Sequence, residues 1–424
     1  MNNLSTQPVK GFRDMYPEEM ALRNWLFGKM RETAKMFGYQ EYDGPILEEL
    51  SLYAAKSGEE LVKEQTFRLT DRGGRELAMR PELTPSLARM VAAKQQQLTY
   101  PLRWFSIGPR FRYEAPQKGR GREFYQFDVD LIGPTTPVAD AEIIAIAATL
   151  LKNLLLTPEE IVIKVNSRSM LQHKLSLIEI PEEKYAGVIR AIDRIDKVSE
   201  EKWVEMLEAQ DLTKDQIKNL QQMLTDQDVS FESESLTEVF STLNDLGVRE
   251  FVEYDPTIVR GLEYYTGTVF EVRDRKGEFR AILGGGRYDN LVELFGGQPV
   301  SGIGFACGDM VLLEVLKEFN LLPDVSKLHA TPTKVLVTVF DESTVRASLK
   351  LANALRTQGV PTELYPDHTV KLDKQIKYAD KKGIQFIIVL GPDEIAREIV
   401  TIKDLKTGQQ DQAPINGALR RFIF

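Results

Sequence analysis

The chain has 424 residues, of which 42% are hydrophobic and 28% are charged, a composition that excludes a disordered protein and predicts two or three globular domains. Its net charge of −9 argues against general affinity for a polyanion, so contact with nucleic acid would require local basic patches. The single cysteine excludes an intramolecular disulfide, and the three histidines lie far apart in the sequence. We therefore predict no zinc site of histidines and cysteines, and we expect any metal to be bound by carboxylates or phosphates.

No membrane or secretory segment is expected. No apolar run approaches the roughly 18 residues that span a bilayer. The first residues lack the basic start and apolar stretch of a secretory signal. These observations predict a cytoplasmic protein without a membrane partner.

The first predicted elements are a helix and an edge strand. Apolar residues at helical spacing predict a long amphipathic helix over residues 17–37, which Gly38 ends. Residues 39–45 follow as a short strand. Because Pro45 cannot donate to a ladder, this strand suits a sheet edge or an interface.

Two further strands are predicted at residues 102–107 and 124–132. In the second strand, apolar residues alternate with Gln126, Asp128 and Asp130. One face of the predicted sheet therefore carries polar side chains that invite a ligand.

A helical insertion is predicted next. Residues 171–250 are rich in Lys, Glu, Gln and Leu, which indicates a solvent-exposed helical subdomain. Strands are predicted at 264–272 and 279–283. The glycines at 284–286 then lead toward a helix near 310–319.

From Thr333 onward, buried strands alternate with helices, which predicts a small α/β domain with a largely parallel sheet. We therefore expect one domain over residues 1–330 and another over 331–424. The second carries 14 Lys and Arg against 11 Asp and Glu, unlike the acidic remainder. Four lysines recur at helical spacing on one side of a predicted helix, either as a solvated face or as a phosphate-contacting one: Lys371, Lys374, Lys377 and Lys381.

The chain contains no Gly-x-x-x-x-Gly-Lys-Ser/Thr phosphate loop. Arginines are the alternative, because a guanidinium matches the oxygens of a phosphate. Arg110, Arg112 and Glu114 share one face of an extended segment. A solvated row of cross-strand ion pairs explains the same pattern, so both interpretations stay open.

The loop over residues 115–122 contains Lys118, Arg120 and Arg122 and no acid, so it is a candidate for phosphate contacts to nucleic acid, or merely a solvated basic turn. On the following strand, Gln126 and Asp130 could hydrogen-bond a small ligand. An acid in that position favours an amine or an imidazole N–H.

A third segment places Arg260 just before a glycine and close to Tyr264 and Tyr265. Ordinary β-propensity accounts equally for a tyrosine pair at the start of a strand. The glycine run over residues 302–308 has the wrong spacing for a dinucleotide fold, so we do not expect an oxidoreductase.

These three segments in this order resemble the three sequence motifs of class II aminoacyl-tRNA synthetases. Residues 260–265 resemble an element peculiar to histidyl enzymes, and residues 11–14, 80–84 and 285–289 extend the similarity. The region from Thr333 is similar to the anticodon-binding domain of that family.

The resemblance implies an α+β fold: an antiparallel catalytic sheet flanked by helices, a helical insertion and a C-terminal α/β anticodon-binding domain. It also implies a homodimer. The activity implied is that of a histidine-tRNA ligase, which uses ATP and Mg²⁺ to activate L-histidine and then transfers it to tRNA(His).

The resemblance also implies roles for individual residues. Arg112 would bind the ATP α-phosphate and the amino-acid carboxylate, Glu114 would lie near the adenine, and Arg260 would stabilise charge during the attack on phosphorus. The loop with Lys118, Arg120 and Arg122 would meet the acceptor end of tRNA. The implied histidine pocket comprises Glu82, Leu83, Thr84, Arg112, Gln126, Asp130, Arg260, Tyr264 and Tyr265.

The sequence departs from the family pattern at two positions. Gly308 is followed by Asp309-Met310, without the arginine that usually holds the ATP γ-phosphate. Leu83 stands where many relatives have glycine, and we expect its bulk to narrow the pocket mouth beside Thr84. The first departure raises an alternative: a non-catalytic, synthetase-like regulatory subunit of ATP phosphoribosyltransferase. Such subunits generally lack both the Tyr-Tyr element and the anticodon-binding domain, whereas this sequence resembles the family in both.

Overall fold

The protein is described from a computed structural model that covers residues 5–54, 64–225, 233–261, 264–328 and 330–422. The chain forms two compact units, residues 1–323 and residues 324–424. Among the helices of the described ranges, none is both long and apolar enough to cross a membrane.

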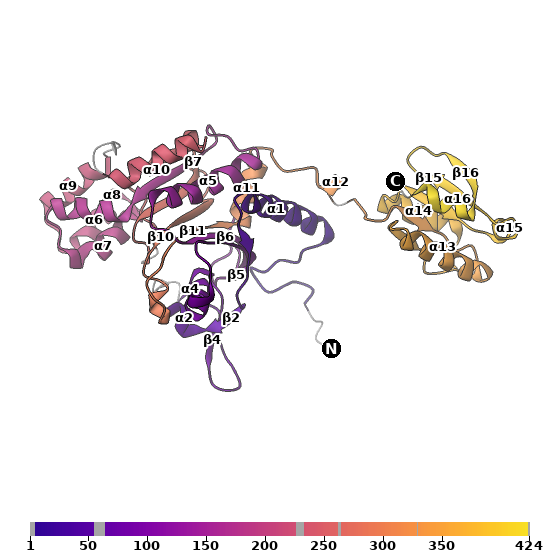
Figure 1. The fold of residues 1–424 in the computed structure, drawn as a ribbon, viewed down its shortest axis with the longest axis horizontal. Coiled ribbons are helices and arrows are strands. Elements are labelled where there is room, and N and C mark those ends of the chain that lie inside the picture. Colours follow the sequence, from indigo (N-terminus) through magenta and orange to yellow (C-terminus); the bar gives the residue numbers. More distant parts are fainter. Residues whose placement is uncertain (1–4, 55–63, 226–232, 262–263, 329, 423–424) are drawn as a thin grey trace. The chain divides into compact units, whose positions relative to one another are not determined.

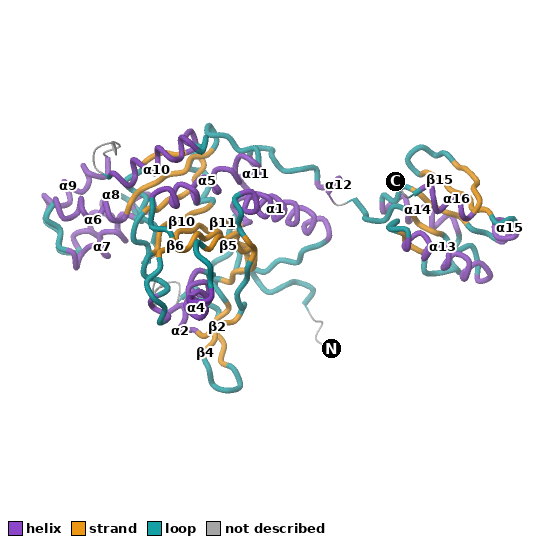
Figure 2. The backbone as a smooth tube through the Cα atoms, viewed as in Figure 1, coloured by secondary structure: helices purple, strands orange, loops and turns teal. Residues whose placement is uncertain are grey.

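The first unit is built on an eight-stranded sheet (Figures 1 and 2). Its six central strands are antiparallel, and only the short strands at the two edges pair in parallel. The antiparallel catalytic sheet is therefore confirmed. In spatial order the strands are β1 (Gln40–Glu41), β5 (Leu102–Phe111), β6 (Glu123–Gly133), β11 (Ser301–Gly308), β10 (Leu283–Tyr288), β9 (Thr268–Asp274), β7 (Ile161–Ser167) and β8 (Val252–Tyr254).

Four helices share the main core with one face of this sheet (Figure 1). Alternation in β6 directs Phe127, Val129 and Leu131 into that core, where each is at most 1% exposed. Polar residues of the same strand consequently face the other side, as predicted. The four helices are α1 (Pro17–Met36), α5 (Pro137–Asn153), α10 (Glu234–Asp245) and α11 (Asp309–Glu318). On the opposite side, α4 (Thr84–Lys94) packs with the ends of β5 and β6 in a separate cluster.

The strands around the glycine cluster differ from the prediction. We expected strands at 264–272 and 279–283 with glycines beyond them, whereas β9 starts at Thr268 and β10 contains Gly284, Gly285 and Gly286. Glycine is ordinarily unfavourable in a strand. It is retained where a ligand or another group approaches the backbone closely.

The helical insertion has a core of its own. Leu175, Ile192, Leu207 and Leu220 are fully buried in it, and Trp203 is 3% exposed. The helices with this core are α6 (Arg168–Leu177), α7 (Tyr185–Ile192), α8 (Glu200–Glu208) and α9 (Lys214–Thr225), with the 3-10 turns η2 (Glu182–Lys184) and η3 (Ile195–Lys197). Helix α10, which we had placed in the insertion, belongs to the main core instead.

A small antiparallel sheet in the order β2-β4-β3 accompanies the large one. Its elements are β2 (Leu47–Glu49), α2 (Leu50–Ala54), β3 (Arg68–Thr70) and β4 (Glu76–Met79). Three 3-10 turns complete the unit: η1 (Gln95–Gln97), η4 (Arg249–Phe251) and η5 (Glu293–Phe295).

The second unit is a five-stranded sheet in the order β13-β12-β14-β15-β16, with helices around it. The first three strands are parallel, as predicted, whereas the last two add an antiparallel hairpin. Its strands are β12 (Val335–Val337), β13 (Thr362–Leu364), β14 (Phe386–Val389), β15 (Ile399–Asp404) and β16 (Gln410–Pro414). Its helices are α12 (Val325–Leu328), η6 (Glu342–Thr344), α13 (Val345–Thr357), α14 (Leu372–Lys382), α15 (Pro392–Ala396) and α16 (Ile415–Arg421).

Candidate active site

Two adjoining cavities open on the polar face of the large sheet. The smaller has a volume of about 120 Å³ and the larger about 290 Å³. Arg112, Gln126 and Arg260 line both. A ligand in one cavity would therefore meet a ligand in the other beside two guanidinium groups.

Small residues of β10 and β11 form the floor of these cavities. Gly284, Gly304, Ala306 and Gly308 all line one or both, and their registers place them on one sheet face with Asp130 of β6. A Cβ atom built on Gly304 would lie 2.2 Å from Oδ1 of Asp130. The floor therefore leaves room for ligands and for the polar side chains beside them.

The smaller cavity is lined by carboxyl and phenol groups. Asp130 is 4% exposed and accepts a hydrogen bond of 2.6 Å from the hydroxyl of Tyr288. Burial raises the pKa of Asp130 to about 7, and neighbouring Asp128 adds to the shift. Glu82 accepts a longer bond, 3.4 Å, from the hydroxyl of Tyr264. Such a pocket suits a small cationic ligand with N–H donors.

Two buried polar atoms in the same region have no hydrogen-bond partner within the described part of the chain. They are Oε1 of Gln126 and Nε of Arg260. Because buried polar groups are almost always hydrogen-bonded, these two atoms indicate that a polar ligand completes the pocket.

The structure brings together eight of the nine residues predicted for histidine binding, all lining the smaller cavity. They are Glu82, Thr84, Arg112, Gln126, Asp130, Arg260, Tyr264 and Tyr265. Tyr288 lines it too and was missed as a site residue, although it lies within the Gly-Gly-Arg-Tyr-Asp run that the sequence analysis singled out. Residues 262 and 263 of the tyrosine-containing segment lie outside the described residues.

Leu83 is the predicted pocket residue that does not line either cavity. Its side chain is 1% exposed, and its Cδ1 lies 3.3 Å from where a Cβ of Gly44 would be. The bulk of Leu83 is therefore accommodated inside the protein and does not narrow the pocket mouth.

The larger cavity is rich in guanidinium groups. Nε of Arg112 donates to the carbonyl of Pro81 at 3.0 Å, and its guanidinium lies 5.3 Å from the ring centre of Phe124. Arg120 forms an ion pair with Glu114, and both line the cavity. These contacts fix the cations in a pocket suited to a phosphorylated ligand.

Arg280 is a lining cation that the sequence analysis missed. Desolvation, with Arg120 nearby, lowers the pKa of its guanidinium, which nevertheless stays charged near neutrality. The start of α11 contributes only Met310 and Val311 to this cavity. Where the family usually has an arginine after Gly308, this cavity is therefore lined by apolar side chains. Arg280 is an additional cation in its lining.

Other cations of the arginine-rich segments have structural partners. Arg110 is fully buried and pairs with Asp128 at 2.6 Å, so it does not reach either cavity. The guanidinium of Arg122 lies 4.0 Å from the ring centre of Tyr113. Lys118 has 71% of its side chain exposed; its Nζ forms a 3.6 Å ion pair with Glu314 and lies 5.4 Å from the ring centre of Phe279.

An antiparallel sheet with arginines at the junction of two adjoining cavities agrees with the class II aminoacyl-tRNA synthetase fold that the motifs implied. Comparisons with known proteins narrow this class. Residues 11–310 match the family model described as histidyl-tRNA synthetase, and residues 334–422 match that of the anticodon binding domain. The chain belongs to the histidyl-tRNA synthetase family.

Individual relatives agree with this assignment. The histidine-tRNA ligase of Leptospira biflexa is 36% identical over 99% of this chain and 97% of its own length. The crystal structure of histidyl-tRNA synthetase from a Nostoc species is 26% identical, with a TM-score of 0.75 over 99% of this chain and 100% of that one.

The regulatory-subunit alternative has weaker support. A structure from Bacillus halodurans, titled as an ATP phosphoribosyltransferase regulatory subunit/histidyl-tRNA synthetase, is 23% identical with a TM-score of 0.72 over 92% of this chain and 99% of that one. It shows a shared fold alone. The full-length ligase relatives and the anticodon-domain match favour an enzyme.

Proposed function

We propose that this chain activates L-histidine with ATP to form histidyl-adenylate and transfers the histidyl group to the 3′ end of tRNA(His). The observation that carries the proposal is the pair of adjoining cavities with Arg112 and Arg260 at their junction. This arrangement supports an amino-acid site and a nucleotide site within reach of each other.

Histidine is assigned to the smaller cavity. Asp130 and Glu82 provide acceptors for its ammonium or imidazole N–H groups, and the free oxygen of Gln126 adds another. Tyr264, Tyr265 and Tyr288 enclose the ring. A pocket that hydrogen-bonds a side chain in this way rejects apolar analogues by about 10⁴ to 10⁵, because its buried polar groups would be left unpaired.

The chemical step is assigned to the junction. An oxygen of the histidine carboxylate attacks the α-phosphorus, the bond to the β-phosphate oxygen breaks, and pyrophosphate leaves. In-line displacement of this kind needs positioning and charge stabilisation. Arg112 would orient the carboxylate and the α-phosphate, and Arg260 would stabilise the negative charge that develops between them.

The larger cavity is assigned to ATP, with Glu114 toward the base and with Arg280 and Arg120 available to the phosphate tail. Mg²⁺ is also proposed, held mainly by phosphate oxygens. That arrangement fits this cation because it binds through one or two carboxylates plus substrate phosphates. Among the described residues, Glu114 is the carboxylate that lines this cavity, and because it is assigned to the base, the phosphate oxygens would be the main ligands of the cation.

The second unit and the loop with Lys118, Arg120 and Arg122 are assigned to tRNA. The lysine side chains on and before α14 are exposed, whereas Gln375 and Ala379 on its other side are buried. An exposed cationic helix face suits contacts with phosphates. Lys118 is the most accessible cation of the loop, since 71% of its side chain is exposed whereas Arg120 and Arg122 are half-buried.

We also propose a cytoplasmic homodimer. Ile46 and Leu47 are each 45% exposed beside the small sheet, and Leu69 of the same sheet is 38% exposed. Clustered exposed apolar side chains indicate an interface. Sedimentation velocity over a range of concentrations tests this proposal, and a monomer at micromolar concentration would contradict it.

The experiment that tests the function is ATP–pyrophosphate exchange with each amino acid supplied in turn, followed by charging of tRNA(His). Exchange with histidine alone is expected. Exchange with a different amino acid, or none with any, would overturn the proposed function.

A further inference from the structure

The side chain of Arg260 depends on its neighbours for its position. The residue lies between β8 and β9 with φ of 55°, a left-handed conformation uncommon for a non-glycine residue. Its side chain extends from there into both cavities. Among the described residues, the acid that contacts its guanidinium is Glu271 of β9.

The residue beside Glu271 on the neighbouring strand has no side chain, which leaves space for this contact. The register partner of Glu271 on β10 is Gly284, and a Cβ built there would lie 2.4 Å from Cζ of Arg260. The guanidinium therefore occupies the volume above Gly284. Desolvation opposes ionisation of Glu271, but Arg260 and Arg273 outweigh it and lower the pKa of the carboxyl.

The second oxygen of Glu271 is held by another arginine. Arg273 is two residues further along β9, on the same sheet face, and its Nε donates to Oε1 of Glu271 at 2.6 Å. A carboxylate that accepts from two guanidinium groups has little freedom to rotate. Arg273 thus determines which way Glu271 presents its other oxygen to Arg260.

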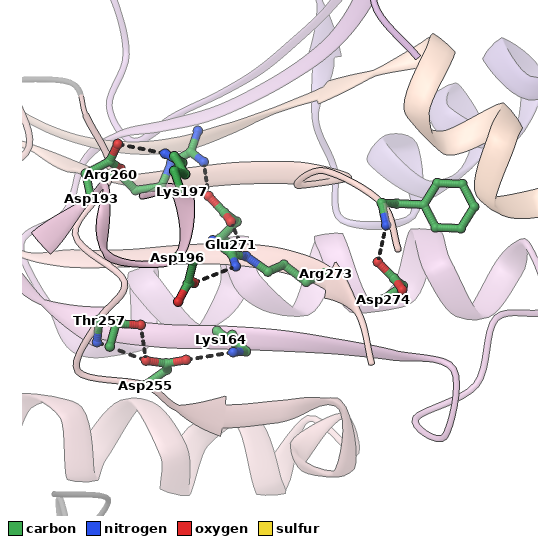
Figure 3. Close-up of polar contacts among 11 residues, drawn as sticks. Lys164, Asp193, Asp196, Lys197, Asp255, Thr257, Arg260, Glu271, Arg273 and Asp274 are labelled. Atoms are coloured by element: carbon green, nitrogen blue, oxygen red, sulfur yellow. Dashed lines mark hydrogen bonds and ion pairs between the residues drawn. The ribbon is translucent and has the colours of Figure 1, made fainter. Parts of the chain in front are cut away.

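Arg273 in turn contacts the helical insertion. Its NH1 group lies 3.1 Å from Oδ2 of Asp196 in η3, 77 residues earlier in the chain. Figure 3 shows the complete row of alternating charges, in which Asp196, Arg273, Glu271 and Arg260 follow one another by ion pairs. One end of the row is in the insertion and the other is in the active site.

We propose that Glu271 and Arg273 are positioning residues for Arg260, and that the insertion, through Asp196, sets the geometry of the activation step. The inference rests on the proposed function, since Arg260 must act on the reacting phosphate. The insertion would thus contribute to the activation step, which takes place within the first unit. Displacement of the insertion would loosen Arg260 while leaving the carboxyl and phenol groups of the histidine pocket in place.

A merely structural ion-pair network is the competing explanation. If the row only stabilised the fold, its variants and those of an unrelated ion pair should lose similar stability, and none should lower kcat selectively. The chain offers a matched control pair, Arg275 and Glu253, which joins β8 to the residue after β9 at 2.7 Å with comparable exposure but does not contact Glu271. Loss of that pair should leave the activation kinetics unchanged.

The test compares Glu271→Gln, Arg273→Gln, Asp196→Asn and Glu253→Gln in histidine-dependent pyrophosphate exchange with full-length protein. We expect kcat to fall about 10²-fold for Glu271→Gln, the scale for a misplaced catalytic group. Because 58% of the Asp196 side chain is exposed, Asp196→Asn should lower kcat by only about 2- to 5-fold, as for a surface ion pair. The histidine KM should change less than about 3-fold in each variant.

The double variant Asp196→Asn/Arg273→Gln should have the kcat of Arg273→Gln alone, because both changes interrupt the same row. Additive losses of kcat in the double variant, or an unchanged kcat in Glu271→Gln, would overturn the inference. The proposed function would stand in either case, provided that the wild-type chain shows histidine-dependent exchange. If Glu271→Gln does not fold, as judged by circular dichroism, Asp196→Asn, Arg273→Gln and their double variant decide the matter. A wild-type chain without histidine-dependent exchange would overturn both proposals.

Discussion

Asp130→Asn is expected to stabilise the protein and to weaken histidine binding at the same time. The change keeps the size and the contact with Tyr288 but removes a carboxylate that is 4% exposed. The unliganded protein bears the desolvation cost of this charge. Histidine offsets that cost by bringing a cation or N–H donors.

The size of the effect follows from the pKa of Asp130, raised from 3.8 to about 7. A shift of about three units corresponds to about 4 kcal/mol. The unpaired amide of Asn costs about 1–3 kcal/mol, so the net gain at pH 8 is about 2 kcal/mol. Because the native state keeps the proton to higher pH than the unfolded chain, stability is lost as the pH rises from about 4 to about 7.

The stability difference should therefore fall by about 3 kcal/mol between pH 8 and pH 5, so that the variant becomes the less stable protein by about 1 kcal/mol at pH 5. Urea unfolding at both pH values measures it, with the transition of each unit followed separately because two units need not unfold together. In pyrophosphate exchange at pH 8, the histidine KM should rise about 10- to 10²-fold, as for a lost charged hydrogen bond. A stability difference that does not vary with pH, or an unchanged KM, would refute the reasoning about Asp130.

Three further predictions concern the other parts of the site. Arg260→Ala should slow activation by at least about 10²-fold, the scale for a lost charge stabiliser, with histidine affinity less affected; an unchanged rate in single-turnover assays would remove Arg260 from the mechanism. Arg280→Gln should raise the KM for ATP about 10-fold, as expected for one charge-assisted hydrogen bond to phosphate, and should leave the histidine KM unaltered; equal changes in both would argue for a structural role. Deleting residues 331–424 should preserve histidine-dependent exchange but abolish efficient charging and flatten its salt dependence; full charging by the truncated chain would refute the assignment of that unit to tRNA.

Local periodicity was sufficient to predict the elements that frame the site. The helix over α1 and the alternation of β6 follow from side-chain spacing within one element. The polar face with Gln126 and Asp130 was predicted in the same way, and the structure places both residues in the smaller cavity. The resemblance to known motifs extended this prediction to residues far apart in the sequence.

What the sequence could not provide were contacts between elements. The glycines over residues 284–286 were placed beyond the predicted strand, yet they lie in β10, where Gly284 leaves space for Arg260. Leu83 was expected at the pocket mouth but points into the protein. The partners Glu271 and Asp196 belong to distant segments, and no spacing rule connects them with an arginine at position 260.

The small residues of β10 and β11 have a consequence for how the enzyme tolerates mutation. Positions 284, 304 and 306 line the smaller cavity, whereas Ile303 and Cys307 of β11 are fully buried in the apolar core. In a saturation-mutagenesis screen for growth, the core positions should accept other apolar residues of similar volume. The substrate-facing positions should accept almost nothing larger than alanine, so the tolerance pattern along these strands should outline the shape of the bound adenylate.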